Sequence, residues 1–158
     1  MSTLQEWLTK KKACQVALDW VETRTLKQAW ADCENPQWML WLLVRLDYND
    51  QQTLRLYACW CAANTPLRDG RVTWDLLTDS RSRKAILVAI DFANGEATAE
   101  ELAAARAAAV AARDARAARA AVWAARDARA AEVAQANELR RRIPYSIVAK
   151  LARKAGSK

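Results

Sequence analysis

The 158-residue sequence contains no histidine, and it has only three glycines, three prolines and one phenylalanine. Without histidine the chain lacks the commonest general base and the commonest imidazole ligand for metals. It also lacks a glycine-rich phosphate loop, a dinucleotide-binding fingerprint and a nucleophile elbow. We therefore predict that the protein is not an enzyme, with no catalytic residues, no cofactor and no metal site.

Long hydrophobic runs are also missing. No segment approaches the roughly 20 apolar residues of a membrane span, and residues 1–8 lack the apolar centre of a signal peptide. The longest apolar run, residues 38–44, is expected to be a buried helix segment. These absences predict a cytoplasmic protein that does not bind a membrane.

Four cysteines occur without the paired spacing of a zinc site. Cys59 and Cys61 are two residues apart, so on one helix they point about 200° away from each other. Cys14 and Cys33 fall in other expected helices. Together with the missing secretion signal, this spacing predicts reduced, buried thiols.

Helix start signals recur along the chain, and no segment alternates as a strand would. Capping boxes pair Thr3 with Glu6, Thr25 with Gln28 and Thr98 with Glu101. Asn35 before Pro36 is a further start signal, and Asn94-Gly95 predicts a left-handed helix end. We predict an all-α protein: a bundle of short helices, then one long Ala/Arg-rich helix, bent or broken at an unknown place, and a short C-terminal helix.

The long helix is predicted from composition. Twenty-two of the 40 residues from 97 to 136 are alanine, the strongest helix former. A continuous helix from Thr98 to Arg142 would be roughly 68 Å long, against about 40 Å for a compact domain of this size. It must therefore bend, break or project, and a projecting helix needs a partner or a second copy to cover it.

Bulky and small side chains divide the sequence at residue 95. Seven of the eight tryptophans lie in the first 74 residues, where most of them are expected to pack in a core. We expect a Trp-rich helical body over residues 1–95 and an Ala/Arg-rich part over 96–158, together forming one integrated domain. Trp123, the single large ring in the alanine-rich part, either docks on the body or anchors a partner.

Charge is distributed unevenly. Residues 1–95 carry 12 basic and 11 acidic residues, whereas residues 96–158 carry 13 and seven. The net charge of +6 in the second part favours an acidic partner, either protein or nucleic acid. Glu138 lies at helical spacing from Arg141 and Arg142, which predicts ion pairs among these three residues.

Most arginines of the alanine-rich segment have no carboxylate at helical spacing. Arg113, Arg116 and Arg119 repeat at intervals of three, and Asp114 and Asp127 have no arginine three or four residues away. Their counter-charges come from the body, a second copy, an acidic protein or nucleic acid, or else the arginines are simply solvated. The predicted partner-binding residues are Arg106, Arg113, Arg116, Arg119, Trp123, Arg126 and Arg129.

Several segments resemble a family of small all-helical immunity proteins of bacteria and phages. The resemblance is carried by residues 24–33 (RTLKQAWADC), 37–42 (QWMLWL), 57–62 (YACWCA), 94–102 (NGEATAEEL) and 139–144 (LRRRIP), in the family's order. It covers most of the chain, including the alanine-rich helix. Family members often interleave Asp and Tyr in that helix, whereas this chain interleaves Arg.

The resemblance implies a protein that binds and neutralises a toxin or another effector, and it transfers no catalytic residues. We accordingly expect a non-enzymatic, immunity or phage anti-defence type of inhibitor, whose basic helical surface blocks an acidic protein partner. If a phage encodes it, the expected location is the host cytoplasm.

Two other hypotheses remain open from the sequence. In the first, the arginine face of the long helix contacts nucleic-acid phosphates. In the second, two copies pair through the alanine-rich helix as a homodimer. Salt-dependent DNA binding would support the first, and a monomeric mass in solution would count against the second.

Overall fold

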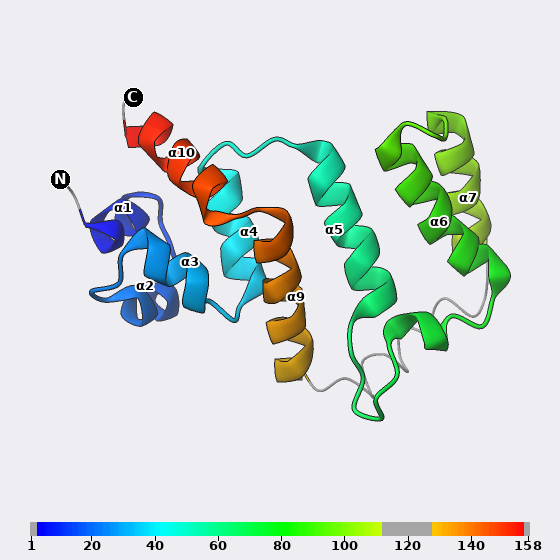
Figure 1. The fold of residues 1–158 in the computed structure, drawn as a ribbon, viewed down its shortest axis with the longest axis horizontal. Coiled ribbons are helices and arrows are strands. Elements are labelled where there is room, and N and C mark those ends of the chain that lie inside the picture. The colour runs from blue at the N-terminus through cyan, green and yellow to red at the C-terminus, as the bar shows by residue number, and fades with distance from the viewer. Residues whose placement is uncertain (1–2, 112–127, 157–158) are drawn as a thin grey trace. The chain divides into compact units, whose positions relative to one another are not determined.

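The computed structural model describes residues 3–111 and 128–156 of the chain. Over these residues it contains nine α-helices, one short 3-10 helix and no strand, which confirms the all-α prediction (Figure 1). The chain is divided into two compact units. Unit 1 comprises Met1–Asn49 and Ala136–Lys158, and unit 2 comprises Asp50–Gln135.

Unit 1 joins the two ends of the sequence. Its helices are α1 (Leu4–Lys10), α2 (Gln15–Val21), α3 (Leu26–Asp32), α4 (Pro36–Arg45), the end of α9 (Ala128–Arg142) and α10 (Tyr145–Gly156). Helix α1 packs on α2, and α10 packs on α3. The largest fully buried side chains described all belong to this unit: Met39, Leu43, Leu139, Ile143 and Val148.

In unit 2, helices that follow one another in the sequence also pack against one another. It contains α5 (Gln51–Asn64), the 3-10 helix η1 (Thr73–Leu76), α6 (Ser80–Asn94), α7 (Ala99–Ala111) and the start of α9. Helix α6 packs against both α5 and α7, so it lies between them in the packing order. The Gln135 amide donates to the Thr65 hydroxyl at 3.0 Å and ties the start of α9 to the end of α5.

The local start and stop signals are confirmed. Capping boxes form at Thr3 and Thr25. Asn35 Oδ1 accepts from two backbone N–H groups at the start of α4. Thr98 and Glu101 exchange the two capping-box bonds at 2.8 and 3.1 Å. Gly95 ends α6 with φ of 80°, a left-handed conformation that suits glycine.

The single long helix stays a prediction. Its two ends exist as α7 and α9, which have 13 and 15 residues. The segment that would join them lies outside the described residues. In α7, Leu102 and Ala105 are buried while Val110 is 81 % exposed, so one face of this alanine-rich helix packs and another is open.

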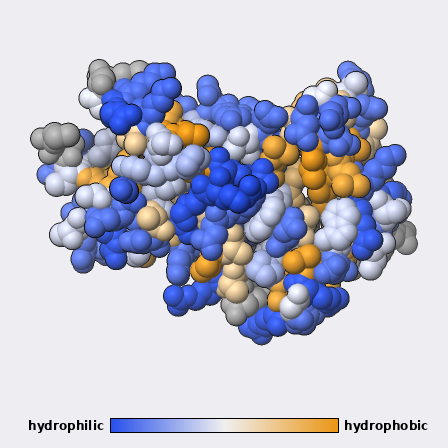
Figure 2. All heavy atoms as spheres, in the orientation of Figure 1, coloured by the Kyte–Doolittle hydropathy of each residue, from blue (hydrophilic) through white to orange (hydrophobic). Residues whose placement is uncertain are grey.

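The expectation for the apolar run is only partly right. In α4, Met39 and Leu43 are buried, but Val44 is 68 % exposed, and Trp38 and Trp41 are half-buried. Figure 2 shows apolar residues reaching the surface in several places among hydrophilic ones. Helix α4 is therefore buried on one side only, although its apolar composition predicts burial on all sides.

Candidate functional site

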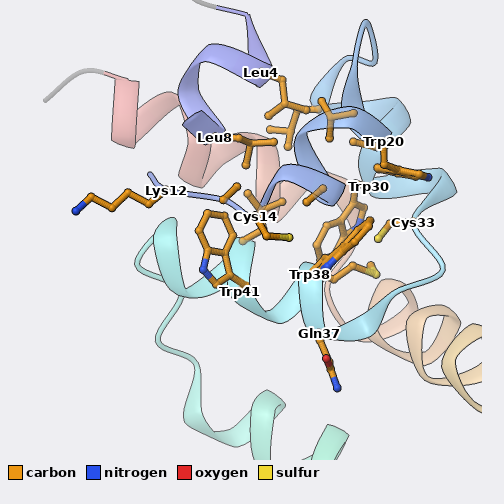
Figure 3. A pocket seen from close by; sticks show the side chains of 17 residues that line it. Leu4, Leu8, Lys12, Cys14, Trp20, Trp30, Cys33, Gln37, Trp38 and Trp41 are labelled. Carbon is orange, nitrogen blue, oxygen red and sulfur yellow. The ribbon is translucent and has the colours of Figure 1, made fainter. Parts of the chain in front are cut away.

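Helices α1 to α4 enclose an apolar cavity of about 360 Å³, here called the tryptophan cavity. Trp20, Trp30, Trp38 and Trp41 contribute to its wall (Figure 3). The remaining lining residues are Leu4, Leu8, Lys12, Ala13, Cys14, Ala17, Val21, Leu26, Ala29, Cys33, Gln37, Met39 and Leu42. Such a lining, apolar with few polar groups, is typical of small-molecule pockets.

The tryptophans of the first 74 residues are less buried than expected from core packing. Trp30 is 3 % exposed, but the other six are half-buried. The rings of Trp20 and Trp38 lie 6.0 Å apart and are tilted by 58°. The Arg24 guanidinium stands 4.7 Å from the centre of the Trp20 ring, an arrangement that favours cation–π attraction.

Helix α10 lines a second space, of about 850 Å³, here called the α10 groove. Its α10 wall is built from Tyr145, Ala149, Ala152, Arg153 and Gly156, which share one helix face by their spacing. The other walls come from α1, α3, α4 and two flanking threonines: Thr3, Leu4, Trp7, Thr25, Leu26, Leu42 and Leu46. The small residues on α10 leave room for apolar side chains of a ligand.

Helix α10 carries three basic residues, of which Arg153 lines this groove. Lys150, Arg153 and Lys154 are exposed, and Ile147 beside them is 36 % exposed. Val148 on the opposite side of the helix is fully buried. Helix α10 is therefore amphipathic, with one edge in the core and a basic edge at the surface.

The three consecutive arginines at the end of α9 serve internal contacts. The Arg140 guanidinium donates to the backbone carbonyls of Trp30 and Cys33 at 3.1 and 2.6 Å. These carbonyls lie at the C-terminal end of α3, where helices lack internal donors and carry partial negative charge. Although Arg140 belongs to the last turn of α9, it therefore caps a different helix, α3.

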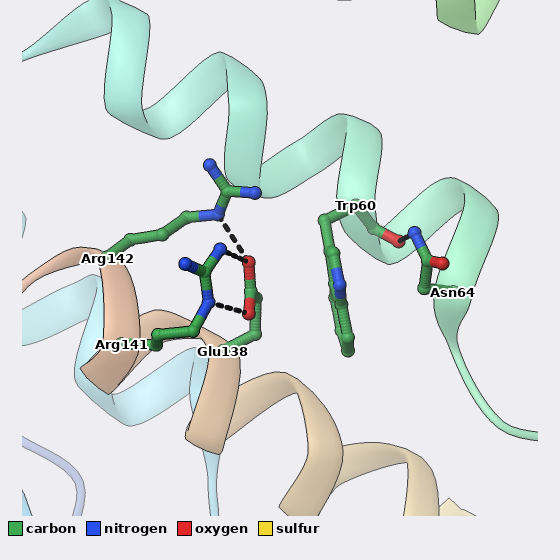
Figure 4. A network of polar contacts seen from close by, with 5 residues as sticks. All are labelled: Trp60, Asn64, Glu138, Arg141 and Arg142. Atoms are coloured by element: carbon green, nitrogen blue, oxygen red, sulfur yellow. Dashed lines mark hydrogen bonds and ion pairs between the residues drawn. The ribbon is translucent and has the colours of Figure 1, made fainter.

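Glu138 forms the ion pairs expected from helical spacing. Its carboxylate accepts from Arg141 at 2.7 Å and from Arg142 at 2.6 Å (Figure 4). The Glu138 side chain is only 6 % exposed. Hydrogen bonds from Arg141 and then Arg142 hold the pKa of Glu138 below its ordinary value of 4.5.

The cysteine prediction is right for two residues and wrong for one. None of these four cysteines, all within the described part of the chain, forms a disulfide; Cys33 and Cys59 are buried, Cys61 is half-buried, and Cys14 is exposed. Burial raises the pKa of the Cys33 thiol. Cys14 is exposed because it precedes α2 as its N-terminal cap residue instead of lying within the helix.

Most of the predicted partner-binding residues lie outside the described part of the chain. Arg113, Arg116, Arg119, Trp123 and Arg126 belong to the segment between α7 and α9. Arg106 on α7 and Arg129 on α9 are both exposed. The arginine face therefore stays a prediction.

A finer count of charge would have pointed to residues 136–158 instead. Residues 96–135 contain six arginines and six carboxylates, so their net charge is zero. Residues 136–158 contain seven basic residues and one glutamate, which accounts for the whole +6. Lys150, Arg153 and Lys154 do not stand out when residues 96–158 are counted as one segment.

Among residues 3–111 and 128–156, no group of three or more Cys, Asp or Glu side chains is placed to hold a metal ion. Within the same ranges, every helix is too short or too polar to cross a membrane.

Comparisons with family models, curated proteins and solved structures find no match to this chain. The resemblance to immunity proteins therefore rests on the quoted sequence segments alone.

Proposed function

We propose that the protein is a non-enzymatic inhibitor that binds an acidic protein partner through the α10 groove. The observation that carries the proposal is the combination of an apolar groove of about 850 Å³ with an exposed basic helix edge in one unit. Protein interfaces commonly combine an apolar centre with a charged rim that selects and orients the partner.

The charge of unit 1 supports an acidic partner. Its N-terminal part, residues 1–49, has six basic and six acidic residues, so the net +6 comes from residues 136–158. Arg140, Arg141 and Arg142 make hydrogen bonds within the unit. Lys150 and Lys154 are exposed on α10, so they are placed to attract an acidic segment.

The groove lining favours protein over nucleic acid as the ligand. Trp7, Leu26 and Leu46 are among the aliphatic and aromatic residues that line it. A nucleic-acid surface would instead present cations to a row of phosphates. An apolar stretch of a partner would fill this groove, and flanking Asp or Glu residues would be attracted by the exposed basic residues of α10.

The inhibitory part of the proposal is supported by the resemblance to immunity proteins. Those proteins act by covering a surface of a toxin or effector. A phage-encoded copy would cover an acidic face of a host defence complex in the same way. This mode of action needs no catalytic group.

The test uses a photo-crosslinker at Ala152 in the groove, in cells that naturally carry the gene. A matched crosslinker at the exposed Ala62 on α5 gives the background. We expect Ala152 to crosslink one protein that Ala62 does not. The wild-type protein should bind and inhibit the purified partner, and a variant with an altered groove should inhibit it less completely.

Binding affinities of charge-reversal variants then test whether the basic residues of α10 contribute to binding. Lys150→Glu with Lys154→Glu should weaken binding at least about tenfold, mostly through the association rate. A Lys84→Glu/Arg81→Glu variant makes the same change in net charge on α6 and should bind as the wild type does. Equal crosslinking at both positions, or equal loss of affinity in both variants, would rule out the groove.

A further inference from the structure

The tryptophan cavity is an unfilled apolar space inside unit 1, with a volume of about 360 Å³. Protein interiors are normally close-packed, with few voids larger than a water molecule. Apolar cavities offer water few hydrogen bonds, and they take up apolar guests instead. Lys12, Cys14 and Gln37 of the wall are exposed, so the cavity reaches the surface and a ligand can enter it.

The charge of the wall favours an uncharged ligand. Among the described lining residues none is acidic, and Lys12 is the single basic one. Figure 3 shows the Lys12 side chain and the Gln37 amide pointing away from the cavity. A charged group moved into this space would lose its hydration without gaining a counter-ion, which is costly. A ligand with several strong hydrogen-bonding groups would be disfavoured in the same way.

The indole rings of the wall favour an aromatic ligand over an aliphatic one. Four tryptophans line the cavity, and the rings of Trp20 and Trp38 are tilted by 58° with their centres 6.0 Å apart. Such rings offer both faces and edges to a planar guest. Offset-stacked and edge-to-face contacts between aromatic rings add to the gain from burying apolar surface.

Two of these rings are held in place by cations. The Arg24 guanidinium lies 4.7 Å from the centre of the Trp20 ring, and the Arg45 guanidinium lies 5.1 Å from the centre of the Trp41 ring. Neither arginine lines the cavity, so the cations hold the two rings from outside it. The wall is therefore partly ordered before a ligand arrives, which lowers the entropy cost of binding.

We propose that the tryptophan cavity binds a small, uncharged, planar aromatic molecule of about two fused rings. Its volume lies at the low end of ligand pockets, which suits a ligand of this size. The affinity comes from burying hydrocarbon against indole faces and aliphatic side chains, and from the absence of any charge that would need a counter-ion.

This site is separate from the proposed partner surface. Leu4, Leu26 and Leu42 line both spaces, whereas Ala17 and Trp38 line only the tryptophan cavity. A variant at Ala17 therefore tests the small-molecule site and leaves the lining of the α10 groove intact. The outcome does not depend on whether a protein partner exists.

The probes are 2-methylnaphthalene, 6-methyltetralin and naphthalene-2-carboxylate. The second has the same two-ring outline with one ring saturated, and the third carries a charged carboxylate in place of the methyl group. We expect 2-methylnaphthalene to bind with a Kd of about 10–100 µM. It should bind about three- to tenfold more tightly than the tetralin, and at least about tenfold more tightly than the carboxylate.

Titrations follow the indole N–H signals in two-dimensional ¹⁵N–¹H NMR, each assigned by its absence in the corresponding phenylalanine variant. The signals of Trp38 and Trp41 should move on binding, because both rings line the cavity. Those of Trp60 and Trp74 in unit 2 should stay unchanged.

A pair of variants locates the site. Ala17→Leu should partly fill the cavity and weaken binding of 2-methylnaphthalene at least about fivefold, while the exposed Ala62→Leu should not change it. Absence of saturable binding, equal or tighter binding of the tetralin or the carboxylate, or equal signal shifts in the two units would overturn the proposal. If Ala17→Leu does not fold, the probe preferences and signal shifts of the wild type still decide it.

Discussion

The Nη1 atom of Arg140 donates a 2.6 Å hydrogen bond to the carbonyl of Cys33, which lies 107 residues earlier in the chain. This contact joins the last part of the sequence to the end of α3 within unit 1. The same guanidinium also reaches the carbonyl of Trp30, so one charged side chain satisfies two carbonyls at the negative end of a helix.

Replacing Arg140 should destabilise unit 1. Arg140→Gln removes charge-assisted hydrogen bonds from a half-buried position, which should cost about 1–3 kcal/mol. The midpoint of urea unfolding, followed by tryptophan fluorescence, measures the effect. The matched control is Arg106→Gln on the exposed side of α7, which should change stability by less than about 0.5 kcal/mol. Equal effects of the two changes would contradict a capping role for Arg140.

Glu138 should make stability depend on pH in the acid range. Because folding lowers its pKa below 4.5, the folded state binds fewer protons than the unfolded chain in the window just below that value. The stabilisation is complete above this window and is lost as the pH falls through the lowered pKa. Glu138→Gln should therefore flatten the curve of unfolding free energy against pH below about 5.

The control for this measurement is Asp69→Asn, since Asp69 pairs with Arg71 at an exposed site. That pair should contribute little to stability, so its removal should leave the acid limb nearly unchanged. An acid limb that is the same in wild type and in Glu138→Gln would show that the Glu138 ion pairs do not stabilise the fold.

The two cysteines that line the tryptophan cavity should differ in reactivity. Cys14 is exposed, whereas Cys33 is buried and its thiol pKa is raised by burial, so its thiolate is both scarce and inaccessible. Iodoacetamide at neutral pH should modify Cys14 at least about tenfold faster than Cys33. Mass spectrometry of timed samples, with Cys14→Ser as the reference, measures both rates. Faster labelling of Cys33 would contradict the burial of α3 in unit 1.

The nucleic-acid hypothesis gives a separate prediction from the sequence. If Arg113, Arg116, Arg119 and Arg126 contact duplex phosphates, each contact adds about 0.9 to the slope of log affinity against log salt. Changing all four to Gln should flatten that slope, measured with labelled duplex DNA across a salt series. The double change Arg81→Gln and Arg83→Gln on α6 provides the comparison. A slope that the four substitutions leave unchanged would exclude the arginine face as a phosphate-binding surface.

Local signals were sufficient to predict where helices begin and end. Thr3, Thr25, Asn35 and Thr98 cap their helices through bonds that reach only two or three residues along the chain. Gly95 ends α6 because its own backbone freedom permits a positive φ. Such signals are complete within a few residues, so they do not depend on the rest of the fold.

The candidate sites needed the tertiary structure. Sequence reasoning directed attention to the alanine-rich arginines, because their repeat is visible along one segment. The tryptophan cavity instead collects side chains from four short helices, and the α10 groove adds a helix from the other end of the chain. The pattern of residues within one helix does not predict whether several helices leave a cavity where they pack together.

The sequence by itself thus determined the helical class, the helix boundaries near the caps and the Glu138 ion pairs, because these depend on interactions over three or four residues. Only the tertiary structure decided that Arg140 caps α3, that Cys14 is exposed and that Trp30 lacks an acceptor among the described residues. These features depend on which distant segments pack together, and that choice is made by the burial of many side chains at once.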